Sequence, residues 1–502
     1  MKLQTDDRTR AIFEVILACL PAPMPVYLVG GAVRDMLLGL PIRDLDFVVP
    51  SDSLRLARAV RRNLGAAGFT LDDERQTARL ILAQGTPSEL ILDFVSFTGM
   101  NLQEDLSNRD FTINTLAVAL DQPDLVLDFL GGERDLREKR LRAASARSME
   151  LDPLRVLRGA RLCLAYQLTP ETATLELMRA SVPSLERVSA ERVRDEIFKI
   201  FELGNPDDAF LLMDSIGLTE QVFPEVRGMK CVPAYPPHVH SLWKHTRQVM
   251  RYLEDVRYFL GGGDLPVTHD FLPEICGALK PYASDISQIL NKPVQGNRTR
   301  WSLLMLAALY HDAGKPAAQT LDEKGRTRFI GHERISAELI GERARALMLG
   351  RAEVDYLRLI AANHMRLHYF SNEGAVLTDR AAYRYFRDLG EAGVDVALLS
   401  LVDMLAAYEG TLDLAKGRRE LKAVLELLDD WYTRRQQVVE PELLLNGNEL
   451  QREFGLKPDA LIGQLLAALR EAQASGEVYN KSGALQFVAQ YLQNKTFHER
   501  NL

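Results

Sequence analysis

Short apolar runs separated by amphipathic stretches mark the chain up to residue 140. Apolar runs that are rich in β-branched and aromatic residues and bounded by turn residues are typical of buried strands. Five of them occupy residues 26–30, 45–49, 78–84, 89–97 and 125–131. Between these runs, apolar residues recur at helical spacing. The pattern therefore predicts a small α/β domain over residues 1–140.

After residue 141 the strand signal almost vanishes, and apolar residues recur at helical spacing with breaks at Pro and Gly. The stretch at 231–240 reads "CVPAYPPHVH", which is proline-rich and typical of a domain boundary. A weaker break, "RRQQVVEPELLLNG", begins near residue 435. These signals predict an all-α neck at 141–230, a third helical unit at 231–434 and a small helical tail at 435–502.

Composition is that of a soluble globular protein, with 502 residues, 47% hydrophobic and 26% charged. The sequence has no apolar run of the roughly 18 residues needed to cross a bilayer. Acidic residues precede the first apolar stretch, unlike a signal peptide. Its four cysteines, at 19, 163, 231 and 276, lack the paired spacing of a zinc site or disulfide framework. We therefore expect a cytoplasmic protein.

A net charge of −8 argues against a general nucleic-acid coat. It still permits a local basic groove, because a site responds to the local field. Residues 136–162 concentrate arginines along a helical stretch. A solvated helix face is the alternative interpretation of that cluster.

A strand, a glycine pair and a helical segment follow one another at residues 26–39. Gly30 and Gly31 would place backbone N–H groups at a helix N-terminus, where a phosphate can approach closely. The G-x-G-x-x-G pattern of dinucleotide-binding folds is absent. The next strand alternates so that Asp44 and Asp46 point to one face. Two solvent-facing aspartates on an edge strand are the alternative.

Neighbouring carboxylates repel each other unless a cation lies between them, and Mg²⁺ is the cation that prefers oxygen ligands and phosphates. Two metals held between aspartates can activate a hydroxyl and neutralise a leaving pyrophosphate, which is nucleotidyl transfer. Asp93 is the candidate for a third carboxylate on a neighbouring strand. An ordinary aspartate at a strand end is its alternative.

Five motifs stand in a recognisable order: "LVGGAVRDMLLGLPIRDLDFVV", "EDLSNRDFTINTLAV", "DFLGGERDLREKRLR", "DPLRVLRGARL" and "ERVRDEIFKIF". In this order they resemble class II tRNA nucleotidyltransferases, a family that includes poly(A) polymerases and completes the CCA end of tRNA. The resemblance implies a polymerase-β-like α/β head with a small sheet, Mg²⁺, the substrates CTP and ATP, and tRNA as partner. It implies that Asp44 and Asp46 are the catalytic metal pair. Nucleotide binding is implied for Gly30, Gly31, Arg34, Arg109, Asp110, Asn114, Asp152, Arg155 and Arg158.

Asp152 and Arg155 match the family's protein template for the incoming base. Residues three apart share a helix face, so a carboxylate acceptor and a guanidinium donor can address one base edge. The carboxylate accepts from the exocyclic amino group of C or A, while G and U present the wrong pattern. An ordinary helix salt bridge is the alternative for this pair taken alone.

The sequence departs from the family pattern at three places. Leu151 stands where Glu usually precedes the template aspartate, and Asn108 stands where an arginine usually precedes Arg109. The segment between Asp93 and Glu104 leaves almost no room for the flexible loop of CCA-adding members. We therefore expect efficient addition of C and poor addition of the final A. A poly(A) polymerase, an A-adding enzyme and a non-catalytic RNA-binding protein are the alternatives.

A second group of residues carries metal-binding chemistry: His245, His311, Asp312, His332, His364 and Asp403. Asp403 would be a charge inside an apolar helix, which is costly unless it is paired or bound to metal. The ordered series resembles the HD phosphohydrolase superfamily. That resemblance implies Mg²⁺ or a transition metal, and a phosphatase or 2′,3′-cyclic phosphodiesterase activity. Structural histidines are the alternative. The tail resembles the C-terminal segment of these enzymes, with tRNA contact and plain packing both open.

Overall fold

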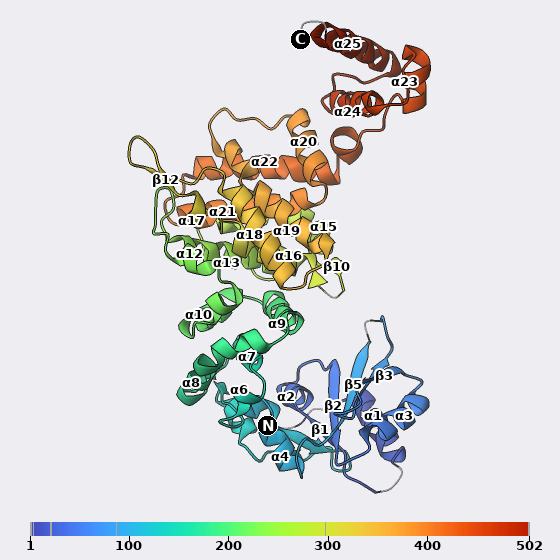
Figure 1. Cartoon of the computed structure of the whole chain (residues 1–502), viewed down its shortest axis with the longest axis vertical. Coiled ribbons are helices and arrows are strands. Elements are labelled where there is room, and N and C mark those ends of the chain that lie inside the picture. The colour runs from blue at the N-terminus through green and yellow to red at the C-terminus, as the bar shows by residue number, and fades with distance from the viewer. Residues whose placement is uncertain (1–2, 4, 21–22, 87, 297, 500–502) are drawn as a thin grey trace. The chain divides into compact units, whose positions relative to one another are not determined.

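The computed structural model describes residues 3, 5–20, 23–86, 88–296 and 298–499. The chain divides into two compact units, one of Met1–Leu203 with Asp208–Val222 and one of Gly204–Asp207 with Phe223–Leu502. α10 (Pro206–Ser215) contains residues of each. The first unit holds a sheet with helices, and the second is almost entirely helical (Figure 1). The finer division into four domains stays a prediction.

A seven-stranded sheet forms the core of the first unit, in the order β3-β4-β5-β2-β1-β6-β7. Its strands are β1 (Tyr27–Val29), β2 (Asp44–Val49), β3 (Ala67–Asp72), β4 (Thr77–Leu82), β5 (Leu90–Ser96), β6 (Ala117–Ala119) and β7 (Val126–Leu127). Within this sheet, and among the residues that the structure describes, only β2 and β5 pair in parallel. The five predicted strands are therefore confirmed, while β3 and β6 escaped prediction.

One face of the sheet is apolar and the other bears aspartates, because side chains alternate between the two faces along each strand. Phe47 on β2 and Phe94 on β5 stack with ring centroids 5.1 Å apart, and Phe13 packs edge-on against Phe47. This apolar face is covered by α1 (Asp7–Ala18) and α3 (Ser53–Leu64). Asp44 and Asp46 consequently point to the opposite face, where α2 (Gly31–Leu38) follows the glycine turn.

Short helices and the predicted neck complete the first unit. They are α4 (Leu102–Ser107), η1 (Thr112–Asn114), α5 (Gly132–Arg137), α6 (Ser148–Leu151), α7 (Arg155–Tyr166), α8 (Thr172–Ser181), η2 (Val182–Arg187), α9 (Ala190–Glu202) and α11 (Leu218–Val222), with a small β8 (Arg140–Leu141) and β9 (Thr169–Pro170) pair. α7 packs against α9, and both bury an apolar stripe. The helical character expected after residue 141 is confirmed.

Helices of the second unit surround two almost fully buried ones, α16 (Arg300–Tyr310) and α21 (Ala392–Tyr408). The others up to the tail are α12 (Val226–Lys230), α13 (Leu242–Leu260), α14 (Leu272–Leu279), η3 (Lys280–Tyr282), α15 (Ala283–Leu290), α17 (Lys315–Ala318), α18 (His332–Ala346), α19 (Arg351–Asn363), η4 (His364–Ser371), α20 (Asp379–Leu389) and α22 (Leu414–Tyr432). Two short hairpins are β10 (Pro293–Gln295) with β11 (Arg298–Thr299), and β12 (Thr320–Leu321) with β13 (Thr327–Arg328).

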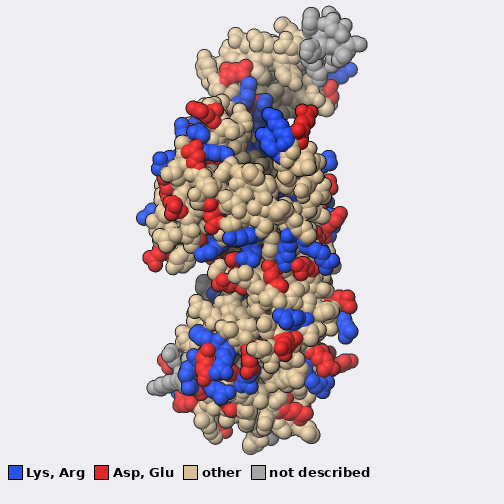
Figure 2. Space-filling view, turned by 90° about the vertical axis from the view of Figure 1, so that its left-hand side faces the viewer, with Lys and Arg blue, Asp and Glu red and all other residues tan. Residues whose placement is uncertain are grey.

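The tail consists of η5 (Arg435–Val439), α23 (Gly447–Phe454), α24 (Ala460–Ala474) and α25 (Lys481–Glu499). It has an apolar cluster of its own around Leu450, Leu465 and Leu469. Among the described residues, no helix is both long and apolar enough to cross a membrane. Positive and negative side chains are interspersed over the face of the molecule drawn in Figure 2.

Candidate functional sites

A polar cavity of about 630 Å³ lies in the first unit, over the aspartate-bearing face of the sheet. Ten of the residues predicted from the sequence line it: Gly30, Gly31, Arg34, Asp44, Asp46, Arg109, Asp110, Asn114, Arg155 and Arg158. They come from α2, β2, the 109–114 segment and α7, which the fold brings together from distant parts of the chain. The eleventh, Asp152, is not among the residues that line this cavity.

The glycine turn brings the backbone close to the cavity. Gly30 has φ +78°, and a Cβ there would lie 3.0 Å from the Arg109 side chain, so a larger residue would be strained and crowded. Gly31 begins α2. Three residues later, Arg34 is buried, donates to Asp35 at 2.9 Å and lies 4.1 Å from the centre of the Tyr166 ring. The first turn of α2 therefore offers backbone N–H groups and a fixed guanidinium to an anion.

Asp44 and Asp46 lie on one face of β2, as the alternation predicted. Burial raises the pKa of both carboxyl groups, and the nearby Asp93 raises it further, although arginines oppose the shift. Carboxylates gathered in this way are stabilised by a divalent cation, and their hard oxygen atoms are the ligands that Mg²⁺ prefers. The residues present therefore fit a magnesium site.

Asp93 lies beside this pair. It faces Asp46 directly across the parallel β2–β5 pairing. Its carboxylate is held by Arg79 of β4 in a bidentate ion pair, with N–O distances of 2.9 and 2.7 Å. The expectation that Asp93 lies on a strand next to Asp44 and Asp46 is confirmed, but no sequence pattern indicated its arginine partner.

A hydrogen-bonded network ties the 109–114 segment to α2 and α7. Asp110 is buried, accepts from Asn114 Nδ2 at 3.0 Å, and pairs with Arg158 at 3.3 Å. Burial alone would raise its pKa, but Arg158 and these hydrogen bonds outweigh burial and lower the pKa of Asp110. Asn114 in turn accepts from Arg34. The network fixes three side chains that face the cavity.

The prediction that Asp152 and Arg155 share one face of a helix is wrong. Asp152 has an extended backbone between α6 and α7, and α7 begins only at Arg155. Asp152 pairs with Arg192 at 2.7 Å. The Arg155 guanidinium instead donates to the backbone carbonyls of Arg109, Ser148 and Asn108, at 2.8 to 2.9 Å. Pro153, between them, disfavours a helical conformation at the preceding aspartate.

Sequence reasoning missed several cationic residues that line the same cavity. Arg161 on α7 pairs with the buried Glu196 of α9 at 2.7 Å, and Lys199 donates to the same carboxylate at 2.9 Å. Arg43 precedes the first aspartate of β2. The signal for Lys199 was present, because it lies in the quoted motif "ERVRDEIFKIF".

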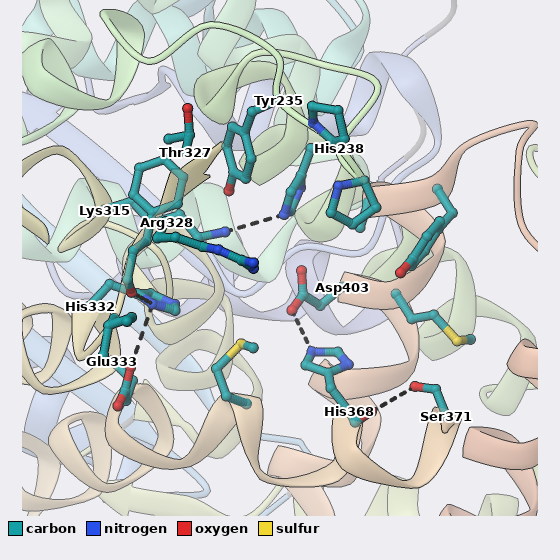
Figure 3. A pocket seen from close by; sticks show the side chains of 18 of the residues that line it. Tyr235, His238, Lys315, Thr327, Arg328, His332, Glu333, His368, Ser371 and Asp403 are labelled. Carbon is teal, nitrogen blue, oxygen red and sulfur yellow. Dashed lines mark hydrogen bonds and ion pairs between the residues drawn. The ribbon is translucent and has the colours of Figure 1, made fainter. Parts of the chain in front are cut away.

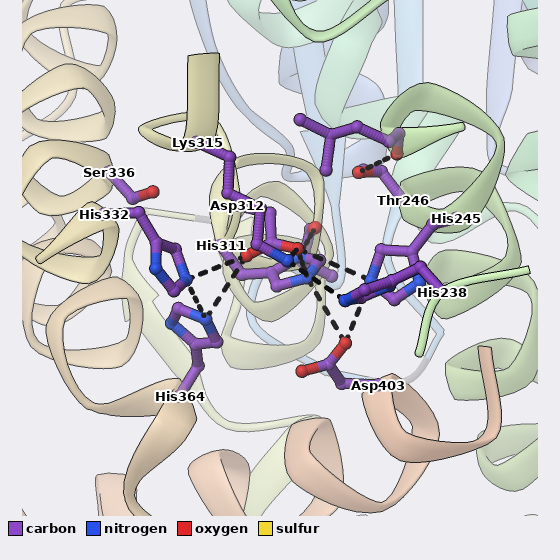
Figure 4. A network of polar contacts seen from close by, with 12 residues as sticks. His238, His245, Thr246, His311, Asp312, Lys315, His332, Ser336, His364 and Asp403 are labelled. Atoms are coloured by element: carbon purple, nitrogen blue, oxygen red, sulfur yellow. Dashed lines mark hydrogen bonds and ion pairs between the residues drawn. The ribbon is translucent and has the colours of Figure 1, made fainter. Parts of the chain in front are cut away.

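The second unit brings all six residues of the predicted metal site together, from α13, α18, η4, α21 and the end of α16 (Figure 4). Two overlapping sets have ligand atoms within 4.8 Å of one another, and both contain Asp312. These sets are His245, His311, Asp312 and Asp403, and Asp312, His332 and His364. Every member is buried. The arrangement is that of two metal positions that share one carboxylate.

Three of these histidines are oriented for metal binding by their backbone. The Nδ1 atoms of His311, His332 and His364 lie 2.7, 2.7 and 2.8 Å from the carbonyl oxygens three residues earlier. Nδ1 therefore donates a hydrogen bond, and the lone pair of Nε2 faces the cluster, which is how metal-ligating histidines are held. Burial lowers the pKa of His311, but the Asp312 and Asp403 carboxylates outweigh it and raise that pKa to about 10. A cation is thus favoured at this point.

A cavity of about 470 Å³ opens onto this cluster (Figure 3). Its wall includes Tyr235, Lys315 and Arg328, and its lower part includes His368 and Asp403. Lys315 Nζ lies 2.5 Å from Asp312, so it stands beside the cluster. The cavity therefore combines cationic side chains with an aromatic wall next to the metal ligands.

His368 and Glu420 support the cluster from below. His368 joins Asp403, at 2.8 Å, to the buried Glu420, at 3.0 Å. Glu420 also accepts from Ser371 and Ser400. Sequence reasoning missed both His368 and Glu420. Glu420 lies on α22 with no motif around it. Lys315 had a signal in "HDAGKP".

Comparison with known protein families matches three parts of the chain. The Poly A polymerase head domain covers residues 26–93 and 84–142, and the probable RNA and SrmB-binding site of polymerase A covers 167–229. The HD domain covers 282–407, so the metal-site residue His245 lies before the matched range. Fold and site together thus define a nucleotidyltransferase head followed by an HD domain.

Curated relatives extend over nearly the whole chain. The chain is 31% identical to the A-adding tRNA nucleotidyltransferase of Deinococcus radiodurans, over 94% of this chain and 96% of the relative. It is 30% identical to the CC-adding tRNA nucleotidyltransferase of Thermus thermophilus, over 93% of each, and 28% identical to that of Geobacter sulfurreducens, over 94% and 96%. The chain belongs to the tRNA nucleotidyltransferase family.

Solved structures share the fold. The apo form of a CCA-adding enzyme aligns with a TM-score of 0.63 at 22% identity, covering 97% of this chain and 95% of that one. The Thermotoga maritima CCA-adding enzyme in complex with tRNA aligns with a TM-score of 0.59 at 23% identity, covering 97% of each. The expected fold class, an α/β nucleotidyltransferase head followed by helical domains with an HD domain, is confirmed.

Proposed function

We propose that this chain adds cytidine nucleotides from CTP to the 3′ end of tRNA, with Asp44 and Asp46 holding Mg²⁺. The observation that carries this proposal is the carboxylate pair of β2 facing a cavity lined by arginines from α2, the 109–114 segment and α7. A triphosphate and an RNA 3′ end are both anionic, and such a cavity attracts both.

The residues of the cavity divide the work of nucleotidyl transfer. The Gly30–Gly31 turn and Arg34 bind the triphosphate through backbone N–H groups and a fixed guanidinium. Asp44 and Asp46 are the residues that would hold Mg²⁺. The chemistry supplied by Mg²⁺ bound there is activation of the 3′ hydroxyl and neutralisation of the leaving pyrophosphate. Arg109 and Arg158 stabilise the added negative charge.

Selection of the base falls to Asp152 and Arg155 in this proposal. Both are engaged elsewhere, Asp152 with Arg192 and Arg155 with three carbonyls. Reading a base edge therefore requires that nucleotide binding replace some of these bonds. The charge-assisted bonds to the base would be of the same kind as those they replace, so the exchange is nearly balanced.

Restriction to C is supported by the connection between β5 and α4, which spans only residues 97–101. Asp105 accepts from the backbone and hydroxyl of Thr98, at 3.0 and 2.9 Å, and Glu104 accepts from Met100 N at 2.8 Å. This tied turn leaves no loop that could rearrange between CTP and ATP.

Primer extension tests the proposal. Purified protein is given tRNA transcripts that end before the CCA or after CC, with CTP, ATP or both. We expect two C residues on the first transcript and little A on the second. Efficient A addition to the CC transcript would support an A-adding or CCA-adding enzyme, which the Deinococcus relative's name also allows. Long A tails on unrelated RNA would identify a poly(A) polymerase. Absence of any nucleotide addition that depends on Asp46 would indicate a non-catalytic RNA-binding protein.

A second activity is favoured by the buried cluster of the HD domain. We infer that it hydrolyses a 2′,3′-cyclic phosphate or a phosphomonoester at an RNA 3′ end with Mg²⁺ or a transition metal. The backbone-oriented histidines and the adjacent cavity with Lys315 and Arg328 support this assignment. RNA ending in a 2′,3′-cyclic phosphate is the test substrate. His311→Ala should abolish metal-dependent hydrolysis while C addition survives; a wild type without hydrolysis and without bound metal would refute it.

A further inference from the structure

Charged side chains continue beyond Asp46 across the neighbouring strands of the sheet. Asp46, Asp93 and Arg79 are direct neighbours across β2, β5 and β4, because Asp46 pairs in register with Asp93, and Asp93 with Arg79. Side chains at paired positions of adjacent strands point to the same face. Asp93 and Arg79 therefore stand on the face that bears the catalytic pair.

The ion pair between Asp93 and Arg79 has good geometry and partial shielding. Both carboxylate oxygens are engaged, at 2.9 and 2.7 Å, and the Asp93 side chain is 17% exposed while that of Arg79 is 37% exposed. A bidentate guanidinium–carboxylate pair fixes orientation as well as charge. The oxygens of Asp93 are thus occupied by Arg79, while its charge remains close to Asp44 and Asp46.

We propose that Arg79 is a positioning residue that sets the cation affinity of the Asp44–Asp46 pair by holding Asp93 out of the metal site. This inference rests on the proposed function, in which those two aspartates hold Mg²⁺. The carboxylates of Asp44, Asp46 and Asp93 with the Arg79 guanidinium have a formal charge of −2. If the negative electrostatic field of these side chains were too weak, the cation would dissociate. If it were too strong, the metal and pyrophosphate would stay bound after each addition.

Substitutions that each remove one charge of the ion pair separate the possible roles. Arg79→Met leaves a charge of −3 and frees the Asp93 carboxylate, so Mn²⁺ should bind about tenfold tighter. Asp93→Asn leaves Arg79 unpaired beside the catalytic pair, and Mn²⁺ should bind about tenfold weaker. The double variant restores −2, so its affinity should return close to that of the wild type. If Asp93 were itself a metal ligand, the double variant would stay as weak as Asp93→Asn.

The measurement is Mn²⁺ binding to the full chain, followed by electron paramagnetic resonance of the free ion. All proteins carry His311→Ala and His364→Ala, which remove a ligand from each metal set of the HD domain. Asp72→Asn with Arg75→Met is the matched control, because it removes an exposed ion pair from the β3–β4 hairpin. Circular dichroism verifies that each variant is folded.

Two outcomes overturn the inference. The first is an Arg79→Met protein that binds Mn²⁺ no tighter than the wild type. The second is a double variant as weak as Asp93→Asn. Failure of the proposed function would be recognised by a different result: Asp46→Asn would leave Mn²⁺ binding unchanged. A functional readout completes the test: the Mg²⁺ concentration for half-maximal C addition should fall in Arg79→Met and rise in Asp93→Asn.

Discussion

Replacing Asp46 by Asn should stabilise the metal-free protein although it removes a carboxylate that the proposed function requires. Asp46 faces Asp93 across neighbouring strands, which lie about 4.8 Å apart, so the two charges are about 5 Å apart. At an effective dielectric of 20 this repulsion costs about 3 kcal/mol. Arg109 and Arg158 oppose this repulsion, but burial, the largest cause of the raised pKa of Asp46, leaves about 1 kcal/mol to be gained. For a unit of this size that raises the Tm by about 2–4 °C.

The pH dependence fixes the sign. The pKa of Asp46 is raised in the folded state, so the folded protein binds this proton more tightly than the unfolded chain. The destabilisation by the ionised Asp46 carboxylate is therefore fully present above the pKa of Asp46 in the folded protein. It disappears as the pH falls toward the pKa of this group in the unfolded chain, which is about 3.9. The gain in Asp46→Asn should be largest at pH 7–8 and absent near pH 3.5.

Differential scanning calorimetry in EDTA is the assay, and the exposed Asp121→Asn is the matched control. In proteins that also carry His311→Ala and His364→Ala, added Mg²⁺ should raise the Tm when Asp46 is present and leave that of Asp46→Asn in place, and C addition by the Asp46→Asn variant should fall at least a thousandfold. A lower Tm for Asp46→Asn than for the wild type in EDTA would refute the reasoning, because it would mean that the carboxylate makes net favourable contacts without a cation.

Three further predictions concern stability. Asp110→Asn should cost about 2 kcal/mol in urea denaturation at pH 7, since Arg158 loses its partner; because the pKa of Asp110 is lowered in the fold, this difference should vanish as the pH falls below about 4. Mn²⁺ at a thousandfold excess over its Kd should stabilise the second unit by about 4 kcal/mol in calorimetry, and His311→Ala combined with His364→Ala should abolish the shift. Burial raises the pKa of Asp430 to about 6, so stability falls as the pH rises from about 4 through 6; Asp430→Asn should be about 1 kcal/mol more stable than the wild type at pH 8 and equal to it at pH 4.

Local patterns carried much of the fold and most of the site. The alternation in β2 placed Asp44 and Asp46 on one face, and short apolar runs located β1, β2, β4, β5 and β7. These features depend on neighbours in sequence. β3 escaped although Ala67, Phe69 and Leu71 alternate with Gly68, Thr70 and Asp72, because this alternation is short and the strand is largely exposed; β6 escaped because it has only three residues. A short run of this kind gives only a weak periodic signal.

Long-range partners were beyond sequence reasoning. Nothing around Arg79 indicates that it would pair with Asp93, and Glu420 reaches His368 from another helix. Both pairs exist because the fold brings together chain segments that no local pattern links. The same is true of Arg155, whose donors meet carbonyls 46 and 47 residues earlier. An ionisable residue's partner decides its role, and that partner is set by tertiary structure.

The carbonyl clamp of Arg155 also explains how this chain tolerates two departures from the family pattern. Arg155 contacts residue 108 through its backbone oxygen, so the side chain there can be Asn rather than Arg without loss of the clamp. Asp152 is held by Arg192, and its own oxygen accepts from Leu154 N at 3.2 Å. The exposed Leu151 takes no part in holding that carboxylate, so a glutamate is not required at that position for its orientation. Both substitutions therefore fall where the side chain is not used, and the residues that anchor the 109–114 segment to α7 are kept.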